Sequence, residues 1–226
     1  STKKFHIGKN VNLIYSPERE NPGDKLFSYE KTAKVVSGYS KKCRKIAYNL
    51  YKIIAKKVYL CPNIETAEMT KLVENCYRSV NISLVNEFKI ISEKLGINIW
   101  EVLKAARTKN FGYRSFRPGP GTGGHCIPID PFYLSWVSKK NNYNPKMLMS
   151  ASTINEEIPK WTINQIKKVF KNKKISKKNI LLLGVAYKKD VDDTRESPSV
   201  KLFQSLIKNN FNVYFNDPYI KKINFS

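Results

Sequence analysis

The stretch from Ile64 to about Leu95 constrains the fold of this 226-residue chain more than any other. Apolar residues recur along it at helical spacing, and no glycine or proline interrupts the pattern. Gly96 follows directly and is a typical helix stop. A helix of this length exceeds the average of globular proteins, which suits packing against other domains or a second subunit. The sequence therefore predicts a helical middle built on one long helix.

Shorter elements flank this helix on both sides. Before it, Val35–Gly38 and Val58–Cys61 read as strands joined by an amphipathic helix over Ser40–Lys56. After the helical middle, a buried strand is expected at Ile180–Val185. Ser197-Pro198 then supplies the N-cap and first position of another helix. We predict an α/β chain with two incomplete doubly wound parts around an all-α centre.

Three domains follow from this pattern. Residues 1–63 are expected to be the end of a Rossmann-like domain, and residues 64–173 a central helical domain. Residues 174–226 are expected to begin a second Rossmann-like domain. The match to Gly-x-Gly-x-x-Gly at residues 119–124 contains a proline and follows no strand, so it is not a dinucleotide fingerprint. The first doubly wound domain is therefore expected to lack its beginning, and the chain is interpreted as a fragment.

The net charge of +23 raises the question of nucleic-acid binding. The lysines are scattered along the chain, so a basic surface with an anionic small substrate explains the charge better, and no specific nucleic-acid partner is expected.

The four cysteines form no Cys-x-x-Cys pair and no zinc-like spacing, which predicts free thiols in a reducing cytoplasm and no metal site. No run approaches the roughly 18 apolar residues of a membrane span.

One cysteine stands at the end of a loop rich in glycine and proline. Residues 117–124 contain four glycines and two prolines, and His125 and Cys126 follow at once, with Asp130 four residues further on. Glycine lets backbone approach a substrate, and proline fixes the loop. A buried structural cysteine is the alternative. The combined pattern favours a nucleophile. His125 is expected to hold the loop through a hydrogen bond, and the alternative is that a charged His125 lowers the pKa of Cys126.

The sequence Pro118–Leu134 resembles the nucleophile loop of the nucleotide-sugar 6-dehydrogenases, the UDP-glucose/GDP-mannose dehydrogenase family. Within it, the motif Ile-Pro-Ile-Asp-Pro-Phe-Tyr is most similar to the UDP-N-acetylglucosamine 6-dehydrogenase branch. Three further blocks resemble the family in the right order, namely Ser16–Gly23, Thr66–Asn75 and Tyr187–Pro198. Nearly the whole chain carries the resemblance.

The resemblance implies a twofold oxidation of a sugar C6 alcohol to a carboxylate, with NAD as the cofactor. The cysteine thiolate would attack the aldehyde intermediate, and water would hydrolyse the resulting thioester. A lysine and an asparagine on the long helix would hold the reacting oxygen. The catalytic residues implied are Cys126, Lys71, Asn75, Asp130 and Glu18.

The resemblance also implies binding residues. Lys188 would contact the nucleotide, and Arg195 would reach the NAD pyrophosphate. Both stand before an expected helix N-terminus, which by itself favours an anion site. Arg114 and Phe116 are expected to touch the sugar or a phosphate, and the backbone of Gly123 to approach the substrate.

Several alternatives remain open at this point. UDP-glucose dehydrogenases carry a second glutamate where this chain has Pro22, which favours an N-acetylated UDP-sugar. UDP-N-acetylmannosamine dehydrogenase is then the alternative to the glucosamine enzyme. A homodimer through the central helix is expected, and the chain could act only as an inactive dimerisation module.

Overall fold

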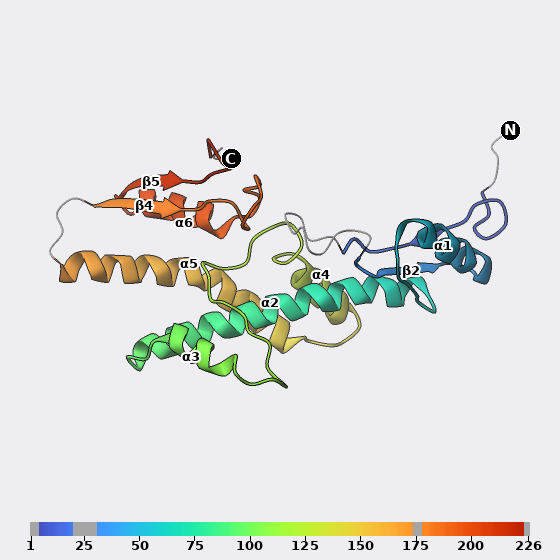
Figure 1. Cartoon of the computed structure of the whole chain (residues 1–226), viewed down its shortest axis with the longest axis horizontal. Helices are drawn as coiled ribbons and strands as arrows, with labels where there is room; N and C mark the ends of the chain where they lie inside the picture. The colour runs from blue at the N-terminus through green and yellow to red at the C-terminus, as the bar shows by residue number, and fades with distance from the viewer. Residues whose placement is uncertain (1–4, 20–30, 174–177, 224–226) are drawn as a thin grey trace. The chain divides into compact units, whose positions relative to one another are not determined.

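The computed structural model of the chain describes residues 5–19, 31–173 and 178–223. Figure 1 shows its helices and strands in chain order. Contacts divide the chain into two compact units, Ser1–Glu74 and Asn75–Ser226. The mixed α/β composition agrees with the fold class predicted from the sequence.

The first unit is built around the strand β2 (Lys34–Gly38), in which every residue is buried. It pairs antiparallel with β1 (Ile14–Tyr15) and parallel with β3 (Val58–Leu60). The helix α1 (Lys41–Ile54) connects the two parallel strands. A parallel pair joined by a helix is the βαβ unit of doubly wound folds, so the strand–helix–strand prediction for this segment is confirmed.

Local sequence explains how α1 packs on β2. The Ser40 hydroxyl accepts a hydrogen bond from the Cys43 backbone N–H and caps the helix. Cys43 and Ala47 form the buried side of the helix. A side chain at Gly38 would place its Cβ 2.6 Å from the Cys43 carbonyl carbon. The close approach of strand and helix therefore requires glycine at this position.

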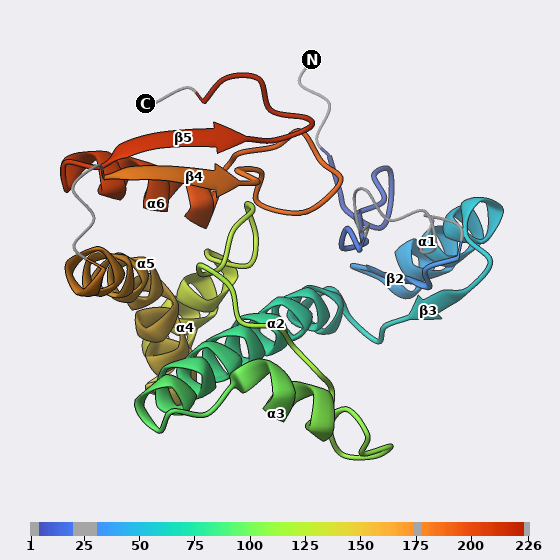
Figure 2. The same cartoon turned by 60° about the vertical axis from the view of Figure 1, so that its left-hand side comes forward.

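Four helices make up the middle of the chain (Figure 2). The longest is α2 (Ile64–Lys94), with 31 residues, and α3 (Ile99–Ala106) follows it after a turn at Gly96. The other two are α4 (Asp130–Lys140) and α5 (Lys146–Asn172). The uninterrupted long helix and the glycine stop were both predicted. A small core between α2 and α3 contains Val85, Ile99 and Leu103.

The helix α5 continues through Pro159 without a break. Proline has no backbone N–H, so the carbonyl of Asn155, four residues earlier, lacks its intrahelical donor. The Thr162 hydroxyl donates to the Ile158 carbonyl, one turn beyond, at 2.9 Å. Packing of Ile158 and Ile163, both buried, holds the helix together on either side of the proline.

The C-terminal part of the second unit is a second βαβ unit. The strands β4 (Asn179–Leu183) and β5 (Asn212–Asn216) pair in parallel, and α6 (Pro198–Lys208) connects them. As predicted, Ser197 caps α6 and Pro198 opens it. Figure 2 shows α6 on one face of the strand pair, on the side of α5. Their shared core contains Ile163, Leu202, Leu206 and Phe211.

Within the described residues, no helix combines the length and the apolar character that crossing a bilayer would require. The same residues bring no three His, Cys, Asp or Glu side chains together in a way that could hold a metal ion.

Candidate active site

The loop of residues 117–130, called the Cys126 loop here, presents its cysteine at the surface. Cys126 is exposed, whereas Cys43, Cys61 and Cys76 are buried. The Cys126 carbonyl accepts hydrogen bonds from the backbone N–H groups of Ile129 (3.1 Å) and Asp130 (2.9 Å). This turn leads directly into α4. The accessible thiol is therefore the one that the sequence selected as the nucleophile.

The structure brings two expected catalytic residues together at the start of α4. The Asn75 side-chain amide, 8% exposed, donates a hydrogen bond of 2.5 Å to the Asp130 carboxylate. Asp130 lies in the first turn of α4, where the helix dipole stabilises a carboxylate. Burial, and then the charge of Asp130, raise the pKa of the neighbouring Cys76 thiol to about 11. Cys76 is thus held as a neutral thiol beside this site.

The glycines of the Cys126 loop dock against the block that precedes α6. A Cβ on Gly123 would lie 2.7 Å from the Pro198 ring and 3.1 Å from Tyr187 Cβ. Gly124 has φ +83° and donates its N–H to the Arg195 carbonyl at 3.3 Å. Packing against Pro198 and Tyr187 therefore leaves no room for a side chain at position 123. The sequence had suggested a different role for Gly123, the close approach of its backbone to the substrate.

A groove of about 460 Å³ lies at the carboxyl ends of β4 and β5. Ligands of open α/β sheets bind at this edge. Lys188 lines the groove, as does Ser199 in the first turn of α6. Asp217 shapes its floor by accepting backbone N–H bonds from residues on both sides, at 2.8 to 3.2 Å. Burial raises the pKa of Asp217, but these bonds outweigh it and lower the pKa overall.

Arg195 stands on the turn that docks the Cys126 loop, and its side chain is 74% exposed. Its guanidinium donates to both oxygens of Asp193, with the closest contact at 2.6 Å. This hydrogen bonding holds the pKa of Asp193 below its usual value. Nη1 makes no bond within the described residues, so the guanidinium retains donors for an anion.

The first unit holds the two remaining catalytic candidates. Lys71 donates from Nζ to the backbone carbonyl of Glu18 at 2.6 Å. The Glu18 carboxylate, on a 62% exposed side chain, pairs with Lys34 at 3.2 Å. Arg19 pairs with Glu74 of α2 at 2.6 Å. The segment that carries Glu18 is thus fixed to β2 and to the start of α2.

The other expected residues are placed differently. Phe116 packs against the core between α2 and α3 and meets the Tyr77 ring edge-on at a centroid distance of 6.1 Å. This packing accounts for the aromatic residue there. Arg114 is exposed. His125 is exposed and makes no hydrogen bond within the described residues, so the expectation that it holds the loop through a hydrogen bond was wrong. Pro22 lies outside the described residues.

Two buried polar residues near the candidate catalytic residues were not predicted from the sequence. Lys34 sits in a fully buried strand, with a side chain only 3% exposed, beside Glu18. Asn155, 6% exposed, accepts a hydrogen bond from the Asn86 side-chain amide at 3.3 Å. For Lys34, a charged residue directly before the apolar Val35-Val36 was the available indication, because buried polar groups need partners.

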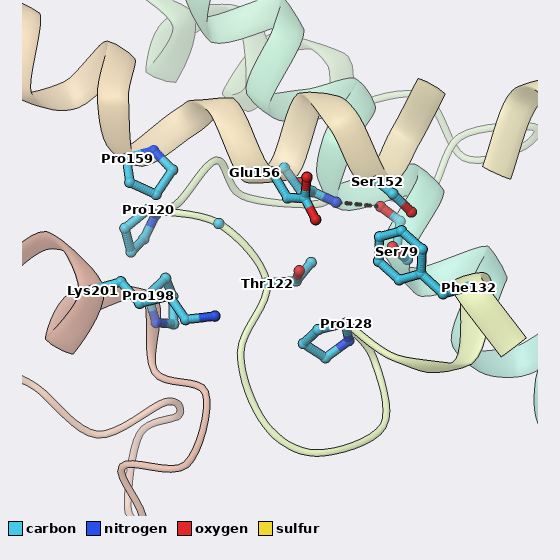
Figure 3. A pocket seen from close by; sticks show the side chains of 12 residues that line it. Ser79, Pro120, Thr122, Pro128, Phe132, Ser152, Glu156, Pro159, Pro198 and Lys201 are labelled. Carbon is cyan, nitrogen blue, oxygen red and sulfur yellow. Dashed lines mark hydrogen bonds between the residues drawn. The ribbon is translucent and has the colours of Figure 1, made fainter. Parts of the chain in front are cut away.

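A cavity of about 160 Å³ is lined in part by the Cys126 loop. Figure 3 shows its wall, made by side chains of α2, α5 and the loop together with the start of α6. The labelled residues include Ser79, Thr122, Glu156 and Lys201. The loop is therefore supported by side chains from several helices of the second unit.

Comparison with known proteins identifies the chain. A model of the central domain of the UDP-glucose/GDP-mannose dehydrogenase family matches residues 65–157. A model of the UDP-binding domain of that family matches residues 181–225. The chain belongs to this family. The resemblance predicted from the four sequence blocks is confirmed.

The relatives of this chain include several UDP-N-acetylmannosamine dehydrogenases. A UDP-N-acetyl-D-mannosamine dehydrogenase of Methanocaldococcus jannaschii is 40% identical over 220 residues, which are 97% of this chain and 49% of the relative. A solved UDP-D-ManNAc dehydrogenase of Pyrococcus horikoshii superimposes with a TM-score of 0.87 at 33% identity, covering 98% of this chain and 53% of that one. A solved UDP-N-acetyl-mannosamine dehydrogenase of Staphylococcus aureus superimposes with a TM-score of 0.82 at 32% identity. The match covers 98% of this chain and 50% of that one.

The chain spans about half the length of the curated relatives it matches. Its similarity covers the central and UDP-binding domains and part of what precedes them.

Proposed function

We propose that the protein carrying this chain is an NAD-dependent nucleotide-sugar 6-dehydrogenase in which Cys126 is the nucleophile. The observation that carries the proposal is the exposed Cys126 thiol four residues before Asp130, whose carboxylate accepts a hydrogen bond from buried Asn75. Family membership supports the same reaction. The substrate class is a UDP-N-acetylhexosamine.

The relatives favour the mannosamine epimer of this substrate. The sequence of the Cys126 loop alone suggested UDP-N-acetylglucosamine as the substrate, with UDP-N-acetylmannosamine as the alternative. The relatives and solved structures described above carry the mannosamine name at 32–40% identity over almost the whole chain. We therefore propose UDP-N-acetylmannosamine as the first substrate to test.

The UDP moiety is proposed to bind in the groove at the carboxyl ends of β4 and β5. Lys188 lines this groove beside the N-terminus of α6. A lysine charge and free backbone N–H groups in the first turn of a helix both stabilise phosphate. The groove's volume of about 460 Å³ is within the range of small-ligand sites.

In the proposed mechanism, the Cys126 thiolate attacks the C6 aldehyde and forms a thiohemiacetal, which is oxidised to a thioester. Asp130 then takes a proton from the water that hydrolyses the thioester. Its hydrogen bond to Asn75 fixes one carboxylate oxygen and leaves the other to accept from water. The carboxylate of Glu18 is the second candidate base.

Lys71 is proposed to stabilise the developing oxyanion. Its ammonium group uses one of three donors on the Glu18 carbonyl, so two remain for substrate oxygen. A charged donor aimed at developing negative charge is an efficient device for lowering the barrier.

NAD, when bound, would accept hydride in each of the two oxidations. Of this chain's residues, Arg195 fits its pyrophosphate, because the guanidinium is exposed and keeps donors that Asp193 does not use. The carbonyl of Arg195 also holds the Cys126 loop through Gly124. The same residue would therefore bind the cofactor and dock the nucleophile.

We further propose a homodimer formed through α2. Exposed apolar side chains recur at helical spacing along its outer side, at Leu84, Phe88, Ile91 and Leu95. An apolar stripe of this kind suits a second helix better than water. Light-scattering mass in solution tests this assembly.

The enzyme proposal is tested with a chimaera in which this chain replaces the matching half of the Methanocaldococcus jannaschii relative. NADH formation is measured with UDP-N-acetylmannosamine and, separately, with UDP-N-acetylglucosamine. We expect activity with the first sugar and its loss in Cys126→Ala. A chimaera that binds UDP but produces NADH with neither sugar would refute the assigned substrate class.

A further inference from the structure

Two asparagines of α2 hold the two ends of the Cys126 loop. Near its start, the Gly119 N–H donates to Asn86 Oδ1 at 2.9 Å. At its end, the Asn75 amide donates to Asp130 at 2.5 Å. The two asparagines are eleven residues apart in sequence, and so are Gly119 and Asp130. The helix and the loop therefore run in opposite directions between matched anchor points.

The helix geometry fixes the distance between these anchors. Eleven helical residues advance about 16 Å and make about three turns, so Asn75 and Asn86 lie on one face of α2. Eleven extended residues could span about 36 Å. The loop uses less than half of its reach, and the excess length arches away from the helix. Cys126 lies on this arch and is exposed.

Asn86 is itself held by a buried chain of amides. It is 0% exposed, and its NH₂ group donates to Asn155 Oδ1 at 3.3 Å. Asn155, 6% exposed, donates in turn to the Ser79 carbonyl at 3.3 Å. The Gly119 N–H can only donate and the Ser79 carbonyl can only accept, so both amides have one possible orientation. A carboxylate or an apolar side chain cannot replace either amide.

Asn155 also supports the middle of the loop through its backbone. Pro159 removes the N–H that would bond to the Asn155 carbonyl within α5. A Cβ on Gly121 would lie 3.2 Å from this carbonyl oxygen, and Gly121 adopts φ +128°. The same asparagine therefore meets the loop at Gly121 and braces Asn86 at the loop's start.

We propose that Asn86 and Asn155 are positioning residues for Cys126. They fix the beginning of the loop on α2, so that the arch presents the thiol in one place relative to the Asp130 anchor. The inference deepens the proposed function, because it rests on Cys126 as the nucleophile. Neither asparagine touches the reacting groups.

Hydrogen–deuterium exchange of this chain tests the anchor without any substrate. Asn86→Ala is expected to speed exchange in residues 117–125 about tenfold, because the buried bond and its partner amide are lost. Asn81→Ala is the matched control, since Asn81 lies on the same helix and bonds only to the Tyr77 carbonyl of α2. Equal loop exchange in the two variants would overturn the proposal.

A second pair of variants tests the anchor if Asn86→Ala does not fold. Gly119→Pro removes the donor N–H but leaves both asparagines in place. Gly119→Ala keeps the donor, and its methyl group meets nothing within 4 Å. Faster loop exchange in the proline variant alone supports the anchor, and identical exchange in the two refutes it.

Kinetics of the chimaera separate this inference from the proposed function. Asn86→Ala is expected to lower kcat about tenfold or more with KM for the UDP-sugar unchanged, since nucleophile placement affects chemistry rather than binding. An unchanged kcat, with Cys126→Ala inactive, would refute the positioning role alone. Full activity of Cys126→Ala would refute the proposed function, whatever the exchange data show.

Discussion

Replacing Gly123 by alanine tests how tightly the Cys126 loop docks on the UDP-binding part. The new Cβ would lie 2.7 Å from Pro198 Cδ, whereas carbon atoms in contact lie about 3.5–4.0 Å apart. The proline ring cannot rotate away, because it opens α6. The loop or the helix must therefore move by about 1 Å. Overpacking of this kind typically costs about 1–3 kcal/mol.

Thermal unfolding measures this cost. For a chain of this size, 1 kcal/mol lowers Tm by about 2–4 °C, so Gly123→Ala is expected to melt about 2–12 °C lower. Gly119→Ala is the control in the same loop, because its methyl group points into open space. Gly123 does not adopt a positive φ, so the difference reports packing rather than backbone strain. Equal Tm values for the two variants would refute the docking described here.

Three further predictions concern the groove, the buried thiol and the helix surface. Lys188→Met is expected to weaken UDP binding about tenfold by calorimetry, and unchanged affinity would place the nucleotide elsewhere. Cys76 has a raised pKa of about 11 against an ordinary 9.0, so its stabilising contribution is complete below pH 9 and is lost as pH rises to 11. Cys76→Ala should flatten the fall of urea-unfolding free energy in that window, and an unaltered fall would contradict the assignment. Phe88→Glu should reduce the solution mass to that of a monomer, and a persisting dimer would exclude this surface.

The sequence predicted those features that local pattern controls. The long helix, its glycine stop and the Ser197-Pro198 helix start were all correct. They were predictable because capping, helix breaking and hydrophobic spacing act within a few residues. The four sequence segments that resemble the family also identified it, since each combines a reactive or charged side chain with residues that fix the local backbone.

Long-range contacts were beyond such reasoning. Lys34 occurs in an apolar strand pattern, and nothing local showed that it would pair with Glu18, sixteen residues away. The partnership of Asn86 with Asn155 spans 69 residues. The unbroken course of α5 through Pro159 depends on packing that propensity does not describe. His125 beside the cysteine suggested a hydrogen bond that the fold does not form.

The central claim is that Cys126 carries the covalent intermediate of a twofold oxidation. The most direct measurement is the stoichiometry of NADH released per UDP-N-acetylmannosamine consumed by the chimaera and by its Cys126→Ala variant. The account predicts two NADH per sugar for the chimaera and no sustained second oxidation for the variant. Two NADH per sugar at an undiminished rate in Cys126→Ala would contradict it.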